Sequence, residues 1–260
     1  HEIDAVKLER KLTLKNFLIP FKLFKSISQS KKILKEIKPD IIFSKGGFVA
    51  LPVVIAGKKL GIPVVSHESD LSMGLANKII LRYCDYMCTA FEETCKQSNK
   101  CIFTGQPIRK AILNGNKNSL PFLSKLKPSL PCLLIVGGSS GASFLNDKVI
   151  ENIDDLCKMF NIIHITGKGK TKEIKKENYF QVEYASNMGD YLNLADFVLS
   201  RAGSGAINEF LQLKKPMLLI PLSKSCSRGD QIENAKLFTA LGYADILEEE
   251  EYSREIFISK

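Results

Sequence analysis

Short apolar runs alternate along the chain with longer segments in which apolar residues recur at helical spacing. Short runs rich in Val, Ile and Leu indicate buried strands, and the longer segments indicate helices. The predicted strands are 40–43, 64–66, 86–89, 101–103, 132–136, 161–166, 179–184, 197–199, 216–221 and 243–247. The predicted helices are 27–37, 51–60, 74–82, 92–97, 142–160, 187–194, 206–213 and 230–241. This alternation predicts an α/β protein with two doubly wound, parallel-sheet, Rossmann-like domains that face a cleft.

The alternation is interrupted over residues 114–131, which are rich in Asn, Gly, Ser and Pro and lack periodicity. We predict a first domain over 1–118, a linker over 119–131 and a second domain over 132–260. The chain begins with His1 rather than Met. We therefore expect a fragment or a processed form, with the first domain incomplete at its start and the second incomplete at its end.

The formal net charge of +9 indicates an anionic partner such as a nucleotide, a nucleic acid or a membrane surface. No RNA- or DNA-binding motif accompanies the charge, so nucleic acid is not the expected partner. Seven cysteines occur without a CxxC pair, which predicts reduced thiols in a cytosolic protein rather than disulfides or a metal site. No run of 18 apolar residues is present, so we expect no membrane-spanning helix.

Residues 14–24 combine Lys with Leu and three Phe at near-helical spacing around Pro20. A basic amphipathic segment can lie on an anionic bilayer with its apolar face in the headgroup region. It can equally be a core-packed helix with a solvated Lys face. For 27–37 we favour the core-packed helix, and for 14–24 both interpretations stay open.

Three strands lead through glycines into helices, at residues 44–48, 137–142 and 200–205. Such a turn leaves backbone N–H groups free at the positive end of a helix, where a phosphate can bind. None of these loops is a GxGxxG or Walker sequence. Glu209 lies about one turn into the helix after the third loop, where its carboxylate can accept hydrogen bonds from two sugar hydroxyls. The alternative is that the loop is only a tight turn between the strand and the helix, and that the Glu209 carboxylate interacts favourably with the helix dipole.

Two further polar groups follow predicted strands. His67, Glu68, Ser69 and Asp70 lie together after one strand, where a His–Glu pair could do acid–base work or cap the next helix. Adjacent strand residues point to opposite faces, so we expect at most one of the two side chains to reach a given ligand. Arg109 follows a Pro turn at the end of another strand.

Six motifs together resemble the MurG family of GT-B glycosyltransferases. They occur in the family's order between about residues 39 and 247, which is more specific than any one loop. The motifs are Lys45-Gly46-Gly47-Phe48 with Pro52, His67-Glu68 with Gly74-Leu75-Ala76-Asn77, Thr104-Gly105-Gln106-Pro107-Ile108-Arg109, Gly137-Gly138-Ser139-Ser140-Gly141-Ala142 with Asn146, Ser200-Arg201-Ala202-Gly203 with Glu209, and Asp230-Gln231 with Asn234-Ala235.

The resemblance implies the GT-B fold and a hexosyltransferase of peptidoglycan synthesis, with roles in cell-wall biogenesis, cell shape and cell division. It would transfer N-acetylglucosamine from UDP-N-acetylglucosamine to an undecaprenyl-pyrophosphate-linked muramyl-pentapeptide, with inversion and without a metal or other cofactor. The enzyme would be peripheral, at the cytoplasmic face of the cell membrane, with residues 14–24 on the anionic surface. The implied donor-binding residues are Arg109, Gly138, Ser139, Arg201, Gly203, Glu209 and Gln231. The implied acceptor-binding residues are Gly46, Gly47, Phe48 and Asn77, and the candidate catalytic residue is Glu68.

The chain departs from the family's pattern in four respects. The family's first glycine loop, which ends in a His that is a candidate base, and its C-terminal helical region are absent, so this chain is expected to be inactive by itself if truncated. Asp70 and Ser140 stand where the family usually has Asn and Gln, which leaves the sugar and the acceptor open. The alternatives are another GT-B UDP-sugar transferase acting on a glycolipid or polysaccharide precursor, and a donor-binding subunit that needs a partner.

Overall fold

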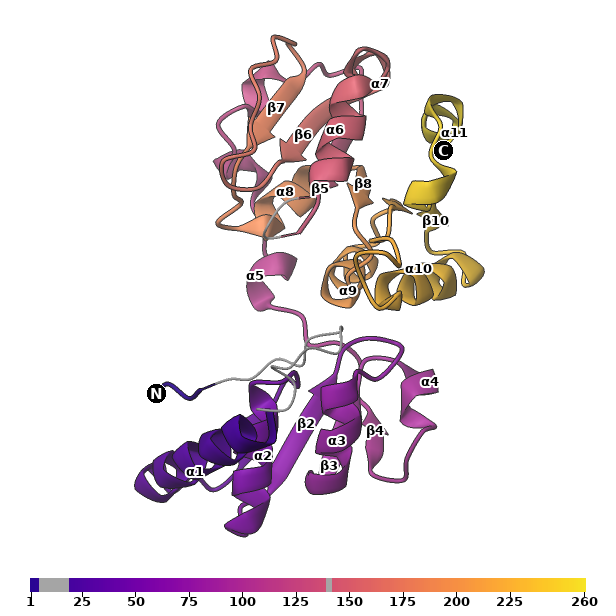
Figure 1. Cartoon of the computed structure of the whole chain (residues 1–260). Helices are drawn as coiled ribbons and strands as arrows, with labels where there is room; N and C mark the ends of the chain where they lie inside the picture. The colour runs from indigo at the N-terminus through magenta and orange to yellow at the C-terminus, as the bar shows by residue number, and fades with distance from the viewer. Residues whose placement is uncertain (5–18, 139–141) are drawn as a thin grey trace. The chain divides into compact units, whose positions relative to one another are not determined.

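The computed structural model describes residues 1–4, 19–138 and 142–260, which form two compact units, His1–Gln106 and Pro107–Lys260 (Figure 1). The division falls before the predicted linker at 119–131, because the residues before and within that linker pack on the second unit. A Cβ atom on Gly115 would lie 1.9 Å from the carbonyl oxygen of Gly189. The ring of Phe122 stacks on Phe180 with 4.9 Å between centroids. The predicted cleft between the units stays a prediction.

The first unit contains a parallel four-stranded sheet in the order β1-β2-β3-β4. Its strands are β1 (Ile42–Ser44), β2 (Val64–Glu68), β3 (Tyr86–Thr89) and β4 (Cys101–Phe103), and its helices are α1 (Ile19–Ile37), α2 (Ala50–Lys59), α3 (Leu75–Tyr83) and α4 (Glu92–Cys95). In Figure 1, α1 lies alongside α2. Ile42 of β1, Val64 of β2 and Met87 of β3 point to the same face of the sheet and are buried with these helices in one core. On the other face of the sheet, Phe43 and Tyr86 are 59% and 54% exposed.

The second unit contains a parallel six-stranded sheet in the order β10-β9-β8-β5-β6-β7. Its strands are β5 (Cys132–Val136), β6 (Asn161–Ile165), β7 (Tyr179–Val182), β8 (Phe197–Ser200), β9 (Met217–Leu219) and β10 (Asp245–Ile246). Its helices are α5 (Lys110–Leu113), η2 (Lys117–Ser119), η3 (Leu123–Lys125), α6 (Ser143–Glu151), α7 (Ile153–Met159), α8 (Met188–Leu194), α9 (Ser204–Gln212), α10 (Asp230–Ala240), η4 (Glu249–Glu251) and α11 (Arg254–Ser259). Every residue of β5 and β6 is buried, as expected for central strands covered on both faces.

The order of this second sheet reverses direction at β5. The chain proceeds from β5 to β6 and β7 on one side, and then returns to place β8 on the other side of β5. In open α/β sheets, the point where the strand order reverses is the usual place for a ligand, outside the carboxyl ends of the strands. The topology therefore identifies the β5–β8 boundary as the part of this unit to inspect for a site.

The predicted elements are largely confirmed, and β3, β4 and β5 have the predicted bounds. Pro20 lies in the first turn of α1, where its missing N–H costs nothing. The single helix predicted over 142–160 is two helices, α6 and α7. Asn152 separates them and donates from Nδ2 to the Lys148 carbonyl and to the Tyr252 hydroxyl, at 2.8 and 2.7 Å. Periodicity does not reveal this break because both helices bury residues in one core.

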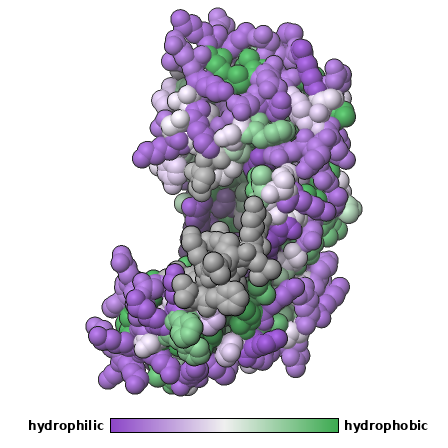
Figure 2. All heavy atoms as spheres, in the orientation of Figure 1, coloured by the Kyte–Doolittle hydropathy of each residue, from purple (hydrophilic) through white to green (hydrophobic). Residues whose placement is uncertain are grey.

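One face of the protein is largely polar. Figure 2 shows hydrophilic residues over most of the face in view, with apolar residues in smaller patches. Among the residues that the structure describes, no helix combines the length and the apolar character needed to cross a bilayer.

Candidate active site

The loops that carry the predicted donor residues lie at one edge of the second sheet. Val136, at the end of β5, pairs with Ser200 at the end of β8, and Ser200 pairs with Leu219 at the end of β9. The loops after these strands lead to Gly138, Gly203 and Gln231. The parallel register therefore brings the loops of Gly138, Gly203 and Gln231 together at the switch point. The sequence alone places each of these residues only after a different strand.

Two helices begin at this edge, α6 and α9. Neither Ala142 nor Gly203, at their N-caps, forms a side-chain cap hydrogen bond. Among the residues that the structure describes, no heavy atom lies within 4 Å of a Cβ atom placed on Gly138, which has a φ of +89°, or on Gly203. The partial positive charge of the two helix N-termini at this edge favours phosphate binding. Ser139, the remaining donor residue predicted for this loop, lies outside the described residues, as does Ser140.

Glu209 and Arg109 meet at this edge, although they are 100 residues apart in sequence. Arg109 Nη2 lies 3.3 Å from Glu209 Oε1, and the side chains are 72% and 18% exposed. Within the described residues, Glu209 Oε2 has no hydrogen-bond partner. The pair contributes little to stability because Arg109 is so exposed. It does leave one carboxylate oxygen available to accept hydrogen bonds from a ligand.

Gln231 and Arg201 differ in what they can offer a ligand. Gln231 Oε1 accepts a hydrogen bond from the Leu222 amide at 3.0 Å, which leaves its Nε2 group to donate. Arg201 is 7% exposed and donates from Nη1 to the carbonyls of Ile220 and Pro221, at 3.0 and 3.2 Å. Its Nη2 pairs with Glu249 at 2.5 Å. These contacts hold the segment after β9 and engage both terminal nitrogens of Arg201, and its predicted contact with the donor stays a prediction.

In the first unit, the predicted acceptor residues Gly46, Gly47 and Asn77 lie together at the carboxyl end of β1. Gly46 and Gly47 have φ angles of +82° and +84°, which favour glycine. A Cβ atom on Gly46 would lie 2.3 Å from Asn77 Oδ1, so the loop packs directly on that amide. Phe48 follows half-buried in the turn that leads to α2. The acceptor role of these residues stays a prediction.

Glu68 is 5% exposed at the end of β2, and its carboxylate is fully engaged. Oε1 accepts from the Asp70 amide at 3.0 Å, and Oε2 accepts from the Gly74 amide and from Asn77 Nδ2 at 3.2 and 2.8 Å. All three donors belong to the loop that leads to α3 or to its first turn. The geometry favours the helix-cap interpretation of Glu68 over a role in proton transfer.

His67 contacts a different set of groups from those that Glu68 contacts. Its Nε2 lies 3.1 Å from the Gly105 carbonyl, and its Nδ1 lies 2.9 Å from Lys45 Nζ. Burial is the main cause that lowers the pKa of His67, and the charge of Lys45 lowers it further against the opposing hydrogen bond to Gly105. Burial also lowers the pKa of Lys45. Lys45 belongs to a motif that we recognised in the sequence, but the sequence assigned it no role.

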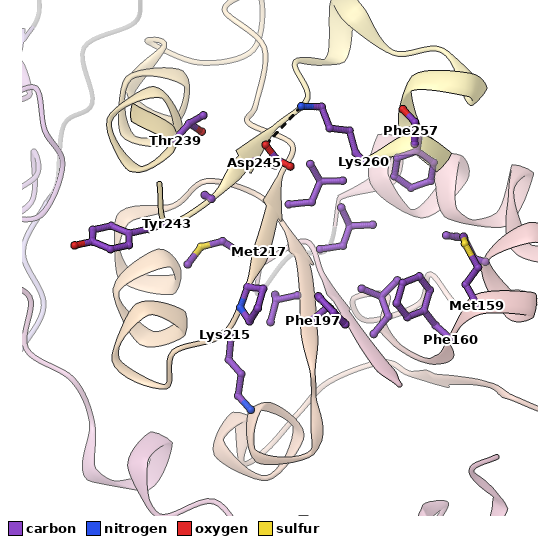
Figure 3. A pocket seen from close by; sticks show the side chains of 18 of the residues that line it. Met159, Phe160, Phe197, Lys215, Met217, Thr239, Tyr243, Asp245, Phe257 and Lys260 are labelled. Atoms are coloured by element: carbon purple, nitrogen blue, oxygen red, sulfur yellow. Dashed lines mark ion pairs between the residues drawn. The ribbon is translucent and has the colours of Figure 1, made fainter. Parts of the chain in front are cut away.

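An apolar groove of about 1040 Å³ lies at the opposite edge of the second sheet (Figure 3). Leu133, Phe197 and Met217, near the amino ends of β5, β8 and β9, line it. The Asp245–Lys260 ion pair, with 3.6 Å between Oδ1 and Nζ, lies at its border. The groove is remote from the carboxyl-end loops, so we do not regard it as the donor site.

Two family models match the chain. The C-terminal domain model of glycosyltransferase family 28 matches residues 132–260, and the N-terminal domain model of that family matches residues 1–89. A protein of Clostridium tetani named UDP-N-acetylglucosamine–N-acetylmuramyl-(pentapeptide) pyrophosphoryl-undecaprenol N-acetylglucosamine transferase is 49% identical over 266 residues, which span 100% of this chain and 74% of the relative. A protein of the same name from Clostridium botulinum is also 49% identical, with the same coverage.

Solved structures show the same fold. The crystal structure of MurG from Acinetobacter baumannii superimposes with a TM-score of 0.71 at 24% identity, covering 100% of this chain and 73% of that one. A UDP-GlcNAc 2-epimerase of Methanocaldococcus jannaschii, solved with UDP-GlcNAc and UDP, gives a TM-score of 0.60 at 15% identity, covering 92% and 74%. The predicted GT-B architecture of two Rossmann-like units with parallel sheets is thereby confirmed.

Proposed function

The chain belongs to glycosyltransferase family 28, and we propose that it transfers N-acetylglucosamine from UDP-N-acetylglucosamine to undecaprenyl-pyrophosphate-linked N-acetylmuramyl-pentapeptide. The observation that carries the proposal is the 49% identity, over the whole chain, to relatives named for this reaction. This identity confirms the resemblance to the MurG family. The reaction is a hexosyl transfer of peptidoglycan synthesis.

In the proposed donor complex, UDP-N-acetylglucosamine lies at the switch point of the second unit. Glu209 Oε2 accepts hydrogen bonds from the ribose hydroxyls, and Arg109 lies beside the nucleotide. The N-termini of α6 and α9 face the diphosphate across the open positions of Gly138 and Gly203. Gln231 donates from Nε2 to the sugar. The uncapped helix ends and the free carboxylate oxygen support this arrangement.

The proposed chemistry is a single displacement that inverts the anomeric carbon. The acceptor hydroxyl oxygen forms a bond to the anomeric carbon while the bond between that carbon and the UDP phosphate oxygen breaks. The hydroxyl proton is released to solvent, and negative charge grows on the departing UDP. Two helix N-termini and an Arg can stabilise this charge without a resident metal. Among the described residues, no group of three His, Cys, Asp or Glu side chains is placed to hold a metal ion.

A substrate panel tests the proposal. We expect radiolabelled N-acetylglucosamine to pass from UDP-N-acetylglucosamine to the lipid-linked acceptor in detergent, with release of UDP and no loss of rate in EDTA. UDP-glucose should react at least about tenfold more slowly, because it lacks the N-acetyl contacts. Preference for another UDP-sugar, or for a lipid acceptor without the muramyl-peptide, would contradict the substrate assignment. UDP binding without transfer to any acceptor would contradict transfer by this chain alone, and would fit either a donor-binding subunit or the truncated enzyme considered above.

We also propose that the protein is peripheral to the cytoplasmic face of an anionic membrane. In α1, Phe21 and Phe24 are 74% and 69% exposed, and Lys22 and Lys25 lie next to them in sequence. Exposed aromatic rings among Lys residues suit a headgroup region. Residues 14–18 of the predicted membrane segment lie outside the described residues, so the proposal rests on 19–24.

The double substitution Phe21→Ser and Phe24→Ser is expected to weaken binding to vesicles that contain anionic phospholipid by about tenfold or more. Each substitution removes an apolar ring that would be buried at the bilayer. Burial of apolar surface contributes about 25 cal/mol of binding free energy per Å². Vesicle co-sedimentation at low salt measures the effect. The matched control is Phe103→Ser, which removes a 53% exposed ring from β4 of the same unit. Equal binding by the double variant and the control variant would refute the role of α1.

A further inference from the structure

Asn146 belongs to the motif around residues 137–142, but the proposed donor complex gives it no role. It lies about one turn into α6 and is 4% exposed. Its Nδ2 donates to the Thr166 carbonyl at 2.8 Å, and its Oδ1 lies 3.0 Å from His164 Nε2. Both of these partners are 0% exposed. The side chain therefore joins α6 to β6 and to the residue that follows β6.

The hydrogen bonds of this network run in one direction. The Thr166 carbonyl can only accept, so the Asn146 amide presents Nδ2 to it and Oδ1 to His164. His164 Nε2 then carries the proton, and its Nδ1 accepts from the Tyr179 hydroxyl at 2.8 Å. Burial lowers the pKa of His164 and so favours the neutral ring that this pattern requires. Each side chain of the network thus has a fixed orientation.

The network connects the start of α6 to the ends of two strands. The backbone N–H of Asn146 donates to the carbonyl of Ala142, the N-cap of α6, at 2.9 Å. The last residue of β6, Ile165, pairs with Val136 at the end of β5. A Cβ atom on Gly137 would lie 2.5 Å from the Ala142 amide nitrogen, so the loop lies close against the helix start. These contacts fix where α6 begins relative to the end of β5.

Apolar packing by itself fixes a helix less sharply. α6 also buries Leu145 and Val149 in the core of the second unit. Such contacts have no preferred direction, so a helix can slide or rotate slightly while it keeps them. Hydrogen bonds weaken steeply when their distance or angle departs from the optimum. The contacts of Asn146 therefore determine the position of α6 more precisely than its apolar face does.

We propose that Asn146, oriented by His164, is a positioning residue that aims the N-terminus of α6 at the diphosphate of the sugar nucleotide. The inference rests on the proposed function for the identity of this ligand. The partial charge at a helix N-terminus falls off within about one turn, so a small displacement of α6 weakens its attraction for phosphate. Both ends of the Asn146 amide are engaged within the protein, so it acts through α6. Asn146 thus strengthens binding of the diphosphate and not binding of the nucleoside.

Asn146→Ala tests the proposal by calorimetry with UDP, and with uridine in competition with UDP. We expect the Kd for UDP to rise about tenfold, because the helix end is no longer held in place. The Kd for uridine should stay within about twofold, because uridine has no phosphate to meet the helix end. The KM for UDP-N-acetylglucosamine should rise with the Kd for UDP, while the KM for the lipid-linked acceptor should not change.

Asn152→Ala is the matched control, because Asn152 is a buried Asn at the opposite end of the same helix. It is 2% exposed, and its Nδ2 donates to the Lys148 carbonyl and the Tyr252 hydroxyl at 2.8 and 2.7 Å. Both substitutions remove a buried amide with two hydrogen bonds, so both should lower the thermal unfolding temperature. Only Asn146→Ala should weaken UDP binding, and Asn152→Ala should keep the Kd for UDP within about twofold.

Two substitutions of His164 test whether its donor orients Asn146. His164→Gln retains an N–H donor near the position of Nε2, so the Asn146 amide keeps its orientation and the Kd for UDP should stay within about threefold. His164→Leu removes this donor and should raise the Kd for UDP as Asn146→Ala does. The effects of His164→Leu and Asn146→Ala should not add, because both release the same helix end. Thermal unfolding shows which variants are folded. Asn146→Ser, whose hydroxyl cannot span both partners, replaces Asn146→Ala if that variant does not fold.

The outcomes distinguish this inference from the proposed function. If the wild type binds UDP and a folded Asn146 variant binds it equally well, or loses affinity for uridine to the same extent, the positioning role is overturned and the proposed function stands. An equal loss of UDP affinity in Asn152→Ala would also overturn the positioning role. Equal UDP affinities for folded His164→Gln and His164→Leu would overturn the part assigned to His164. If the wild type does not bind UDP, the proposed function itself is overturned.

Discussion

Glu209→Ala is expected to weaken UDP binding about 100-fold. In the proposed complex, the carboxylate accepts hydrogen bonds from two ribose hydroxyls through an oxygen that has no partner within the described residues. Each such bond to a charged group contributes about 1.5 kcal/mol or more, and about 1.4 kcal/mol corresponds to a factor of ten in affinity. The side chain is only 18% exposed, so little water replaces the lost contact.

Calorimetry with UDP and 2′-deoxy-UDP measures this effect and identifies its cause. The wild type should bind UDP more tightly than 2′-deoxy-UDP, whereas Glu209→Ala should bind both equally, because the variant has no carboxylate to detect the missing hydroxyl. Glu173→Ala, which removes a glutamate whose side chain is 87% exposed, is the control. A variant that binds UDP as the wild type does, or that still discriminates between the two nucleotides, would rule out Glu209 as the ribose anchor.

Acidification from pH 6.5 to about pH 4 is expected to lower the free energy of unfolding by about 3 kcal/mol through His164. This residue of β6 has 0% exposure, and burial lowers its pKa from 6.5 to about 4. Nδ1 lies 2.8 Å from the Tyr179 hydroxyl and Nε2 lies 3.0 Å from Asn146 Oδ1. Below pH 6.5 the unfolded chain takes up a proton that the folded chain excludes, so this stability is present above pH 6.5 and is lost as the pH falls to about 4.

Urea unfolding followed by circular dichroism between pH 7 and pH 4 measures this dependence. His164→Gln should be less stable at pH 7, because Tyr179 or Asn146 loses a partner, but its stability should vary less with pH in this window. The difference in pH dependence between the two proteins is the diagnostic quantity, since surface carboxylates titrate in both. The same pH dependence in the wild type and the variant would mean that His164 does not exclude the proton.

The candidate site could be predicted in part from the sequence. The glycine loops after strands placed Gly138 and Gly203 at a ligand-binding edge, and one-turn spacing placed Glu209 beside it. The alternative that Glu68 caps a helix was also visible, because it lies shortly before a predicted helix start. The sequence did not reveal the contact between the Lys45 ammonium group and His67, since nothing local to the motif shows that the two side chains meet. It also did not reveal that Arg201 is buried against Ile220, Pro221 and Glu249, because these contacts involve residues that are distant in the sequence.

The sequence by itself determined the order of strands and helices, the parallel α/β class and the family, because periodicity and motif order are properties of the chain alone. Tertiary structure decided which charged side chains lie exposed at the carboxyl edge of the sheet and which are held by internal contacts. Arg109 forms an ion pair with Glu209, which is 100 residues away in the sequence. Arg201, which also follows a strand, is buried and forms an ion pair with Glu249. The physical reason is that hydrogen bonds and burial depend on distance in space. The register that joins the ends of β5, β8 and β9 at one edge is set only when the sheet forms.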